Sequence, residues 1–290
     1  MTMIEVFGTT FQNPILLAAG TAGFGREVAG VIALERLGGL VTKAVSPEPR
    51  HGNAAPRVAE FDGGMLNAVG LANPGLEQVA TVELPWLAEH LTRARVLVNV
   101  VGFQLDDYPE VVERLSGQSI VTAFELNVSC PNTDRGGEEF GADPEVLADL
   151  VRRCKAVTER PLVVKLSPTL PNLSQTADAA VQAGAAGFSL VNTIPGTLFR
   201  FGEPGGEARA RLGYGKGGVS GPALLPVGVL ATRQVAEATG LPVIGVGWVR
   251  TLEDMDQYLE AGASLVAVGT AALADPRVPE RLAEQWRARG

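Results

Sequence analysis

Ala123-Phe-Glu-Leu-Asn-Val128 is followed along the chain by Pro144-Glu-Val-Leu-Ala-Asp-Leu-Val-Arg-Arg-Cys-Lys-Ala-Val157 and then by Pro161-Leu-Val-Val-Lys-Leu166. The first and third segments are short and almost continuously apolar, as parallel strands buried on both faces require. The second has the spacing of a helix with a single apolar stripe. The stripe consists of Val146, Leu147, Leu150, Val151 and Cys154. A strand, a helix and a strand in this order predict a parallel sheet covered by helices.

The same alternation extends over the whole chain. Further apolar runs occupy residues 15–19, 40–44, 96–101, 186–191, 242–246 and 264–268, and further helical patterns occupy residues 176–185, 223–240, 252–262 and 279–289. Strands and helices that alternate in this way, without a break in composition, predict a single α/β domain over residues 1–290, a (β/α)8 TIM barrel. A doubly wound open sheet is the alternative. Residues 3–7 and 9–11 predict a small N-terminal β-hairpin that closes the bottom of the barrel.

Two predicted connections are much longer than the few residues usual between a strand and a helix. They span residues 45–74 and 192–222, and each follows the carboxyl end of a predicted strand. Barrel active sites lie at that end. We therefore expect two long βα loops over the active site, as lids or substrate walls, with surface decoration as the alternative.

Composition excludes several classes of protein. The 290 residues are 46% hydrophobic and 19% charged, which is too apolar for a disordered chain. A net charge of −8 gives a nucleic acid or an anionic membrane no long-range attraction. Two cysteines and two histidines make neither a disulfide framework nor a histidine-rich metal site, so we expect no metal. Because we find no secretory signal and no apolar run of the ~18 residues that span a bilayer, we expect a cytoplasmic protein.

Polar residues interrupt five of the predicted strands near their carboxyl ends. They are Lys43, Asn99, Asn127, Lys165 and Asn192. A buried ammonium or amide without a partner is destabilising, so such side chains persist only where they have partners. Five of them at one end of a barrel predict a binding site for a planar ligand that is rich in oxygen and nitrogen and carries negative charge. For Glu125, two residues before Asn127, we favour a structural hydrogen bond.

Cys130 lies on a loop rich in proline and glycine, just past a predicted strand, where a thiol is placed to react. A buried and inert loop thiol is the alternative. Cys154 belongs to the apolar stripe of a helix and is expected to behave as a small hydrophobic residue.

Glycine-rich turns predict a phosphate site. Gly245-Val-Gly-Trp248 and Val268-Gly-Thr270 follow the last two predicted strands, where backbone N–H groups and a following helix bind phosphate in many barrels. Plain turns at strand ends are the alternative. Gly213-Tyr-Gly-Lys-Gly-Gly218 has the spacing of a dinucleotide motif, but it follows a polar stretch instead of a strand, and we reject that interpretation.

Several motifs, in order along nearly the whole chain, resemble those of dihydroorotate dehydrogenase. They include Asn13-Pro-Ile-Leu-Leu-Ala-Ala-Gly-Thr21, Met65-Leu-Asn-Ala-Val-Gly-Leu-Ala-Asn-Pro-Gly75, Asn127-Val-Ser-Cys-Pro-Asn132, Val164-Lys-Leu-Ser-Pro168 and Gly217-Gly-Val-Ser-Gly-Pro222. Cys130 stands where a membrane-bound class has serine, which points to the soluble class 1. The segments Asn73-Pro-Gly-Leu-Glu77 and Asp134-Arg-Gly-Gly-Glu-Glu-Phe-Gly141 resemble the NAD-linked class 1B, and the fumarate-linked class 1A is the alternative.

The resemblance implies oxidation of (S)-dihydroorotate to orotate in pyrimidine (UMP) biosynthesis, with FMN as the cofactor. It implies that Cys130 removes the C5 proton while C6 transfers hydride to flavin N5, with Lys43 and Lys165 completing the catalytic set. The residues implied for FMN are Ala19, Gly20, Thr21, Lys43, Ala44, Asn99, Asn127, Lys165, Val191, Gly217, Gly247, Trp248, Gly269 and Thr270. Those implied for the substrate are Lys43, Asn67, Ala68, Val69, Gly70, Leu71, Asn127, Asn132, Asn192 and Thr193.

The resemblance also implies a partner. In the NAD-linked class, electrons pass to NAD+ through a second subunit that carries FAD and a [2Fe–2S] cluster, in a heterotetramer with a homodimeric core. This chain has no convincing dinucleotide motif, and its two cysteines cannot supply four cluster ligands.

The chain departs from the family pattern at two positions. Trp248 stands where the family usually has a second glycine, so a positive φ there would be strained, and His51 stands where the family often has phenylalanine. Three rival interpretations stay open. They are another FMN barrel acting on a reduced pyrimidine, such as a dihydropyrimidine dehydrogenase domain, an aldolase with Lys165 as its Schiff-base lysine, and a catalytically silent scaffold subunit.

Overall fold

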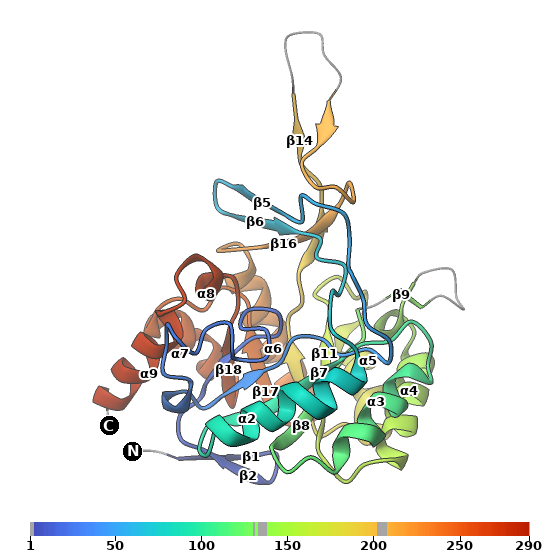
Figure 1. Cartoon of the computed structure of the whole chain (residues 1–290), viewed down its shortest axis with the longest axis vertical. Helices are drawn as coiled ribbons and strands as arrows, with labels where there is room; N and C mark the ends of the chain where they lie inside the picture. The colour runs from blue at the N-terminus through green and yellow to red at the C-terminus, as the bar shows by residue number, and fades with distance from the viewer. Residues whose placement is uncertain (1–2, 130, 133–137, 202–207, 290) are drawn as a thin grey trace.

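The computed structural model describes residues 3–129, 131–132, 138–201 and 208–289 (Figure 1). Within these ranges eight parallel strands close into a barrel, in which each strand pairs with the next along the chain and the last pairs with the first. The strands are β3 (Ile15–Leu17), β4 (Gly39–Val41), β7 (Arg95–Val100), β8 (Val121–Asn127), β11 (Leu162–Leu166), β12 (Gly187–Leu190), β17 (Val243–Val246) and β18 (Leu265–Val268). The (β/α)8 barrel is therefore confirmed, and the alternative of an open sheet is wrong.

Helices follow the barrel strands and cover the outside of the barrel (Figure 1). They are α1 (Leu76–Gln78), α2 (Leu84–His90), α3 (Asp107–Ser116), α4 (Pro144–Ala156), α5 (Leu173–Gln182), α6 (Leu224–Thr239), α7 (Leu252–Glu260), α8 (Thr270–Ala274) and α9 (Val278–Arg289). Among the described residues, short helical turns also occur at η1 (Leu34–Arg36), η2 (Val79–Glu83) and η4 (Phe140–Ala142).

Local sequence explains where these helices begin and end. Asp143 caps α4, because its side chain accepts hydrogen bonds from the backbone N–H groups of Glu145 and Val146 at 2.9 and 3.2 Å. The apolar stripe predicted for this helix is buried against the barrel. α6 ends at Gly240, whose φ of 66° lies in the left-handed region that glycine adopts without strain.

Apolar side chains fill the lower part of the barrel interior. Leu16, Leu97 and Val163 come from three different strands and belong to one buried cluster. Phe7 and Phe11 belong to the same cluster and come from the hairpin of β1 (Ile4–Val6) and β2 (Thr9–Phe11), which covers this end of the barrel. The predicted N-terminal hairpin is therefore confirmed, and it seals the end opposite to the predicted site.

The two long connections pair with each other above the opposite end of the barrel (Figure 1). Their strands form an antiparallel sheet in the order β13 (Ile194–Gly196), β16 (Gly217–Ser220), β6 (Gly64–Asn67) and β5 (Val58–Phe61), which we call the upper sheet. β14 (Phe199–Arg200) and β15 (Arg209–Ala210) form a ribbon that projects beyond it, and β9 (Pro131–Asn132) pairs with β10 (Glu138–Glu139). The predicted loops are thus partly ordered as a sheet over the carboxyl ends of the barrel strands.

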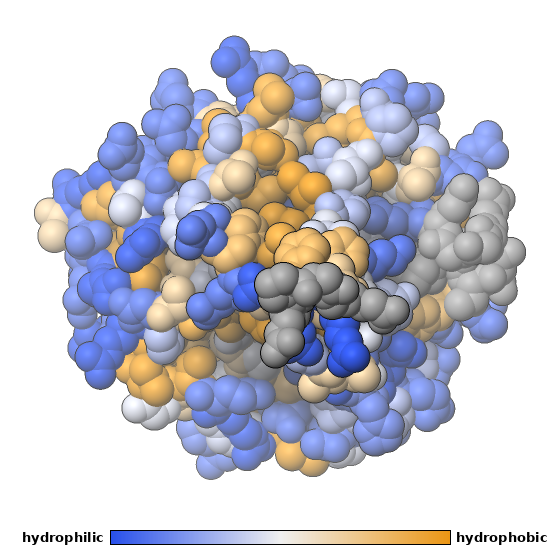
Figure 2. Space-filling view, turned by 90° about the horizontal axis from the view of Figure 1, so that it is seen from above, coloured by the Kyte–Doolittle hydropathy of each residue, from blue (hydrophilic) through white to orange (hydrophobic). Residues whose placement is uncertain are grey.

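The surface around the projecting ribbon carries apolar side chains. Phe199, Phe201 and Tyr214 are 53%, 79% and 60% exposed. Figure 2 views the protein from this side and shows apolar residues gathered near the centre of the face. Across the described residues, none of the helices combines the length and the apolar character that crossing a bilayer requires.

Candidate functional site

A cavity of about 480 Å³ lies between the carboxyl ends of the barrel strands and the upper sheet. The barrel strands contribute polar residues such as Lys165 of β11, and the upper sheet contributes residues such as Asn67 of β6. All strands of a parallel barrel point the same way, so their carboxyl ends meet around one opening. The long connections form the outer wall of that opening.

Most residues predicted for the site line this cavity. From the set predicted for FMN they are Ala19, Gly20, Thr21, Lys43, Ala44, Asn99, Asn127, Lys165, Val191, Gly247, Trp248, Gly269 and Thr270. From the set predicted for the substrate alone they are Asn67, Ala68, Val69, Gly70, Leu71, Asn192 and Thr193. Positions far apart in the sequence therefore meet at one end of the barrel.

Three predicted residues are not placed at the cavity. Gly217 is not among the lining residues; it is the first residue of β16 within the upper sheet, where an added Cβ would lie 2.2 Å from the carbonyl oxygen of Asn67 in β6. A glycine at position 217 allows the close pairing of β16 and β6. Ser220, at the other end of β16, lines the cavity. Cys130 lies outside the described residues, and Asn132 is described only as a member of β9.

Hydrogen bonds fix the amide side chains of the site. Asn192 Nδ2 donates to Asn127 Oδ1 at 3.3 Å, and Asn192 Oδ1 accepts from the backbone N–H of Thr193 at 2.9 Å. Asn67 Nδ2 donates to the carbonyl oxygen of Gly218 at 3.2 Å, across the upper sheet. Each amide can form more hydrogen bonds than these, so the three side chains are held in place while keeping donors and acceptors for a ligand.

Lys165, Glu125 and Asn99 form a buried polar group on the adjacent strands β11, β8 and β7. The exposed fractions of Lys165 and Glu125 are 7% and 1%, and Lys165 Nζ lies 3.6 Å from Glu125 Oε1. The same oxygen accepts a hydrogen bond from Asn99 Nδ2 at 2.6 Å. Asn99 Oδ1 is buried without a hydrogen-bond partner in the described structure, although buried acceptors normally have one. Since Asn99 and Lys165 line the cavity, this acceptor and this cation are available to a ligand there.

Glycine-rich turns and hydroxyl groups surround the other part of the cavity. Gly247, Trp248, Gly269 and Thr270 line it, and Thr270 Oγ1 donates to Ser220 Oγ at 2.7 Å. The helix α8, which begins at Thr270, has only five residues, so the phosphate site predicted here depends on backbone N–H groups of the turns and on hydroxyl groups more than on a helix dipole.

Trp248 has the positive φ that its motif predicts. Its φ is 54° and that of Gly247 is 142°. The half-buried indole lines the cavity, and the guanidinium carbon of Arg250 lies 5.9 Å from the centre of the indole ring. A tryptophan in the left-handed region is strained by ~1–2 kcal/mol, so the surrounding structure must hold it there.

We expect Trp248→Gly to be more stable than Trp248→Ala by roughly 0.5–1 kcal/mol. Both changes remove the indole, but only glycine adopts a positive φ without strain, and the greater freedom of glycine in the unfolded state offsets part of that gain. The free energies of unfolding come from denaturant titrations. Ala238→Gly, on an exposed position of α6, is the control and should be destabilising by roughly 0.5–1 kcal/mol. An alanine variant at position 248 as stable as the glycine variant would contradict the strain.

Sequence reasoning missed several lining residues. They are Ala18, Val58, Met65, Ala72, Ser220, Leu224, Val246 and Leu273. Ser220 could have been found, because it belongs to the Gly217-Gly-Val-Ser-Gly-Pro222 motif. Met65 could have been found in the same way, because it begins the Met65–Gly75 motif, whereas Val58 could not, because its place in the site depends on the pairing of β5 and β6 above the barrel.

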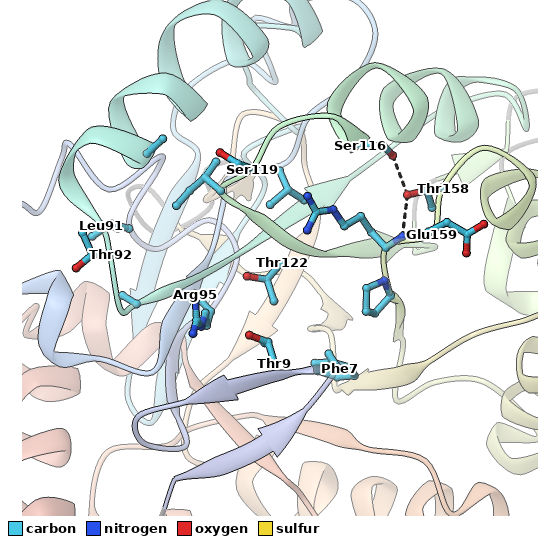
Figure 3. Close-up of a pocket in the computed structure, with 17 residues that line it drawn as sticks. Phe7, Thr9, Leu91, Thr92, Arg95, Ser116, Ser119, Thr122, Thr158 and Glu159 are labelled. Atoms are coloured by element: carbon cyan, nitrogen blue, oxygen red, sulfur yellow. Dashed lines mark hydrogen bonds between the residues drawn. The ribbon is translucent and has the colours of Figure 1, made fainter.

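A larger cavity of about 880 Å³ lies at the opposite end of the barrel. Figure 3 shows Phe7 and Thr9 of the hairpin on one side of it, with Arg95 and Thr122 of the barrel nearby. Arg95 Nε donates to the carbonyl oxygen of Thr10 at 2.9 Å. Among the described residues, none of those predicted for the site lines this larger cavity. Size alone therefore does not identify the functional cavity.

The sequence matches the family model for dihydroorotate dehydrogenase over residues 1–289. It is 44% identical over 282 residues to "Dihydroorotate dehydrogenase B (NAD(+)), catalytic subunit" of Bacillus thuringiensis (strain Al Hakam), which covers 97% of this chain and 89% of that protein. Proteins of the same name from Bacillus cereus (strain AH187) and Bacillus anthracis (strain CDC 684 / NRRL 3495) have the same identity and coverage. The resemblance predicted from the motifs is therefore confirmed, and the chain belongs to the dihydroorotate dehydrogenase family.

Proposed function

We propose that this chain oxidises (S)-dihydroorotate to orotate at the cavity under the upper sheet, as a step of pyrimidine (UMP) biosynthesis. The family is FMN-dependent in general, and we propose FMN as the cofactor of this chain. The observation that carries the proposal is that flavin-type and substrate-type residues, predicted from separate motifs, line a single cavity.

The residues of the cavity fit a flavin. The free acceptor Asn99 Oδ1 suits an N–H group of the flavin ring, and Lys165 supplies a cation beside it. Gly20 leaves open space, since a Cβ added there would meet no atom within 4 Å. The turns at Gly247 and Gly269, with the hydroxyl of Thr270, suit the ribityl phosphate. When bound, FMN accepts the two electrons of the oxidation as hydride.

The remaining polar residues fit a small carboxylated ring. Half-buried Lys43 offers a cation for the carboxylate, and Asn67, Asn127 and Asn192 offer amides that match the alternating N–H and C=O groups of dihydroorotate. This set favours dihydroorotate over a reduced pyrimidine that lacks a carboxylate.

Cys130 is our candidate for the base. Oxidation of dihydroorotate to orotate removes a proton from C5 and a hydride from C6, so a group that accepts the proton is needed. Cys130 follows β8, the strand whose last residue is Asn127 at the cavity, and a thiolate is a suitable base. Lys165 would stabilise the negative charge that bound FMN gains on reduction.

The absorption spectrum of the purified chain, before and after anaerobic addition of dihydroorotate, tests the proposed function. We expect a flavin spectrum that bleaches on addition of dihydroorotate and does not bleach with dihydrouracil, which lacks the carboxylate. A chain without bound flavin that also fails to take up added FMN would contradict the proposal. Bleaching by dihydrouracil alone would instead favour the dihydropyrimidine dehydrogenase interpretation.

We further propose that a partner subunit carrying FAD and a [2Fe–2S] cluster passes the electrons to NAD+. The relatives described above are named as catalytic subunits of NAD(+)-type enzymes, which supports a separate electron-transfer subunit. A heterotetramer with a homodimeric core, a cytoplasmic location and a single domain over residues 1–290 stay predictions.

Without this partner, we expect the chain to reduce an artificial dye with dihydroorotate but to reduce NAD+ only very slowly. The glycine-rich segment Gly213–Gly218 has the spacing of a dinucleotide motif, but it does not follow a strand as the motifs that bind NAD+ do. Steady-state assays with both acceptors measure the difference. Equal turnover with NAD+ and with the dye would exclude the need for a partner.

A further inference from the structure

Glu125 is a buried carboxylate that the proposed reaction does not use. It lies in the middle of β8, and backbone pairing places it next to Asn99 of β7 and Val163 of β11, two residue pairs below the pair of Asn127 and Lys165. Side chains two apart on a strand point to the same face, so Glu125 lies directly beneath Asn127 in the barrel interior. Glu125 is therefore an acidic side chain that lies directly below the cavity.

Two contacts hold the carboxylate in place. Glu125 Oε1 accepts a hydrogen bond from Asn99 Nδ2 at 2.6 Å and lies 3.6 Å from Lys165 Nζ. A carboxylate can only accept hydrogen bonds, so it binds the NH2 end of the Asn99 amide and leaves Asn99 Oδ1 as the end without a partner. Glu125 thus determines which end of Asn99 is available in the cavity, and it places a negative charge beside the lysine.

Stability alone does not explain this arrangement. A buried ion pair is often no more stabilising than apolar side chains of similar volume, because both charges lose their hydration. The lower barrel interior of this chain is filled with apolar residues of that kind. A charged pair that replaces them at the level of the cavity points to a role in the cavity itself.

We propose that Glu125 is a positioning residue that partly offsets the charge of Lys165 and so limits how strongly the site favours reduced over oxidised flavin. The inference rests on the proposed binding of FMN. Reduced flavin carries more negative charge than oxidised flavin, so a lone buried cation beside it would stabilise the reduced form strongly. An enzyme that must hand its electrons on needs a cofactor that is also readily reoxidised, and a carboxylate behind the lysine serves that need.

Glu125→Gln tests the role of the charge, because glutamine has the same shape and keeps an oxygen that can accept from Asn99. We expect the midpoint potential of bound FMN to rise, corresponding to at least a tenfold increase in the affinity for reduced relative to oxidised flavin, or about 30 mV for a two-electron couple. Glu125→Asp keeps the charge and should stay close to the unmodified chain. Glu113→Gln, on an exposed position of α3, removes the same charge at the surface and should leave the potential unchanged.

The measurements are spectroelectrochemical titration of the FMN-loaded chain and binding of oxidised FMN followed by flavin fluorescence. If the unmodified chain binds no FMN, the proposed function fails. If it binds FMN and Glu125→Gln shifts the potential no more than Glu113→Gln, this inference is wrong and the proposed function stands. Should Glu125→Gln not fold, Lys165→Met is compared with Lys165→Met/Glu125→Gln. These two variants also differ only in the carboxylate, and the double variant leaves no buried charge without its partner. Removal of the carboxylate must raise the potential there too, and an unchanged potential would overturn the inference.

Discussion

Replacing Cys130 with serine is expected to slow the reduction of bound flavin by dihydroorotate at least ~100-fold, the effect typical of losing a general base. A free thiol has a pKa of about 8.5, so a thiolate that accepts the C5 proton is accessible near neutral pH. A serine hydroxyl is a far weaker acid and does not provide the corresponding anion. Binding of orotate should change little, because Lys43 and the asparagines of the cavity are proposed to hold that ligand.

The rate of flavin reduction should also rise with pH through one ionisation in the neutral-to-alkaline range. In the proposed mechanism the thiolate form of Cys130 is the active base, so the rate should follow the thiolate fraction, and Cys130→Ser should lose this dependence. Stopped-flow bleaching of the flavin across a pH series measures both the rate and its profile.

Cys154→Ser is the matched control for this experiment. Cys154 is completely buried on α4, where desolvation raises the pKa of its thiol to about 12, so it stays neutral over the pH range tested. This variant should reduce flavin at the normal rate and with the normal pH profile. If Cys130→Ser behaved in the same way, the proton would leave through another residue and the proposed mechanism would be wrong.

The barrel could be predicted because its strands are buried on both faces. Segments such as 161–166 are almost continuously apolar, and a single lysine in such a run is conspicuous. That contrast by itself predicts that Lys165 and Asn127 belong to a binding site, and both residues line the cavity. The strands of the upper sheet do not show this contrast between apolar and polar residues. β16 begins with two glycines, which have low strand propensity, and it pairs with β6, which is far away in the sequence.

Glu125 illustrates a second limit of sequence reasoning. The sequence suggested a structural hydrogen bond, and the carboxylate does accept one from Asn99. Its proximity to Lys165 depends on the register of β8 against both neighbouring strands, which follows from the closure of the barrel and not from local pattern. Gly217 shows the same limit, since a glycine motif does not reveal whether its residues face a ligand or a paired strand, and its contact with FMN stays a prediction.

Replacing Lys165 with methionine should slow flavin reduction by dihydroorotate about 10²–10³-fold, the range for removing one preorganised electrostatic stabiliser. Methionine keeps the unbranched side chain but loses the cation that would stabilise the negative charge arriving on the flavin. The rate is measured by anaerobic stopped-flow bleaching and expressed per bound FMN, so that a loss of cofactor is not counted as a loss of rate. Lys155→Met is the control, since Lys155 is an exposed residue of α4 paired with Glu159 at 3.5 Å, and its loss should leave the rate unchanged.

The partner of Lys165 separates this catalytic effect from a loss of stability. Lys165→Met leaves Glu125 buried without its cation, which should destabilise the fold by ~3–5 kcal/mol, as when one member of a buried ion pair is removed. Lys165→Met/Glu125→Gln removes the stranded charge and should regain most of that free energy of unfolding. Its flavin reduction should nevertheless stay at least about tenfold slower than that of the unmodified chain, because the cation is still missing. A double variant that regained both stability and rate would show that Lys165 serves only to neutralise Glu125, and that the reaction does not need its charge.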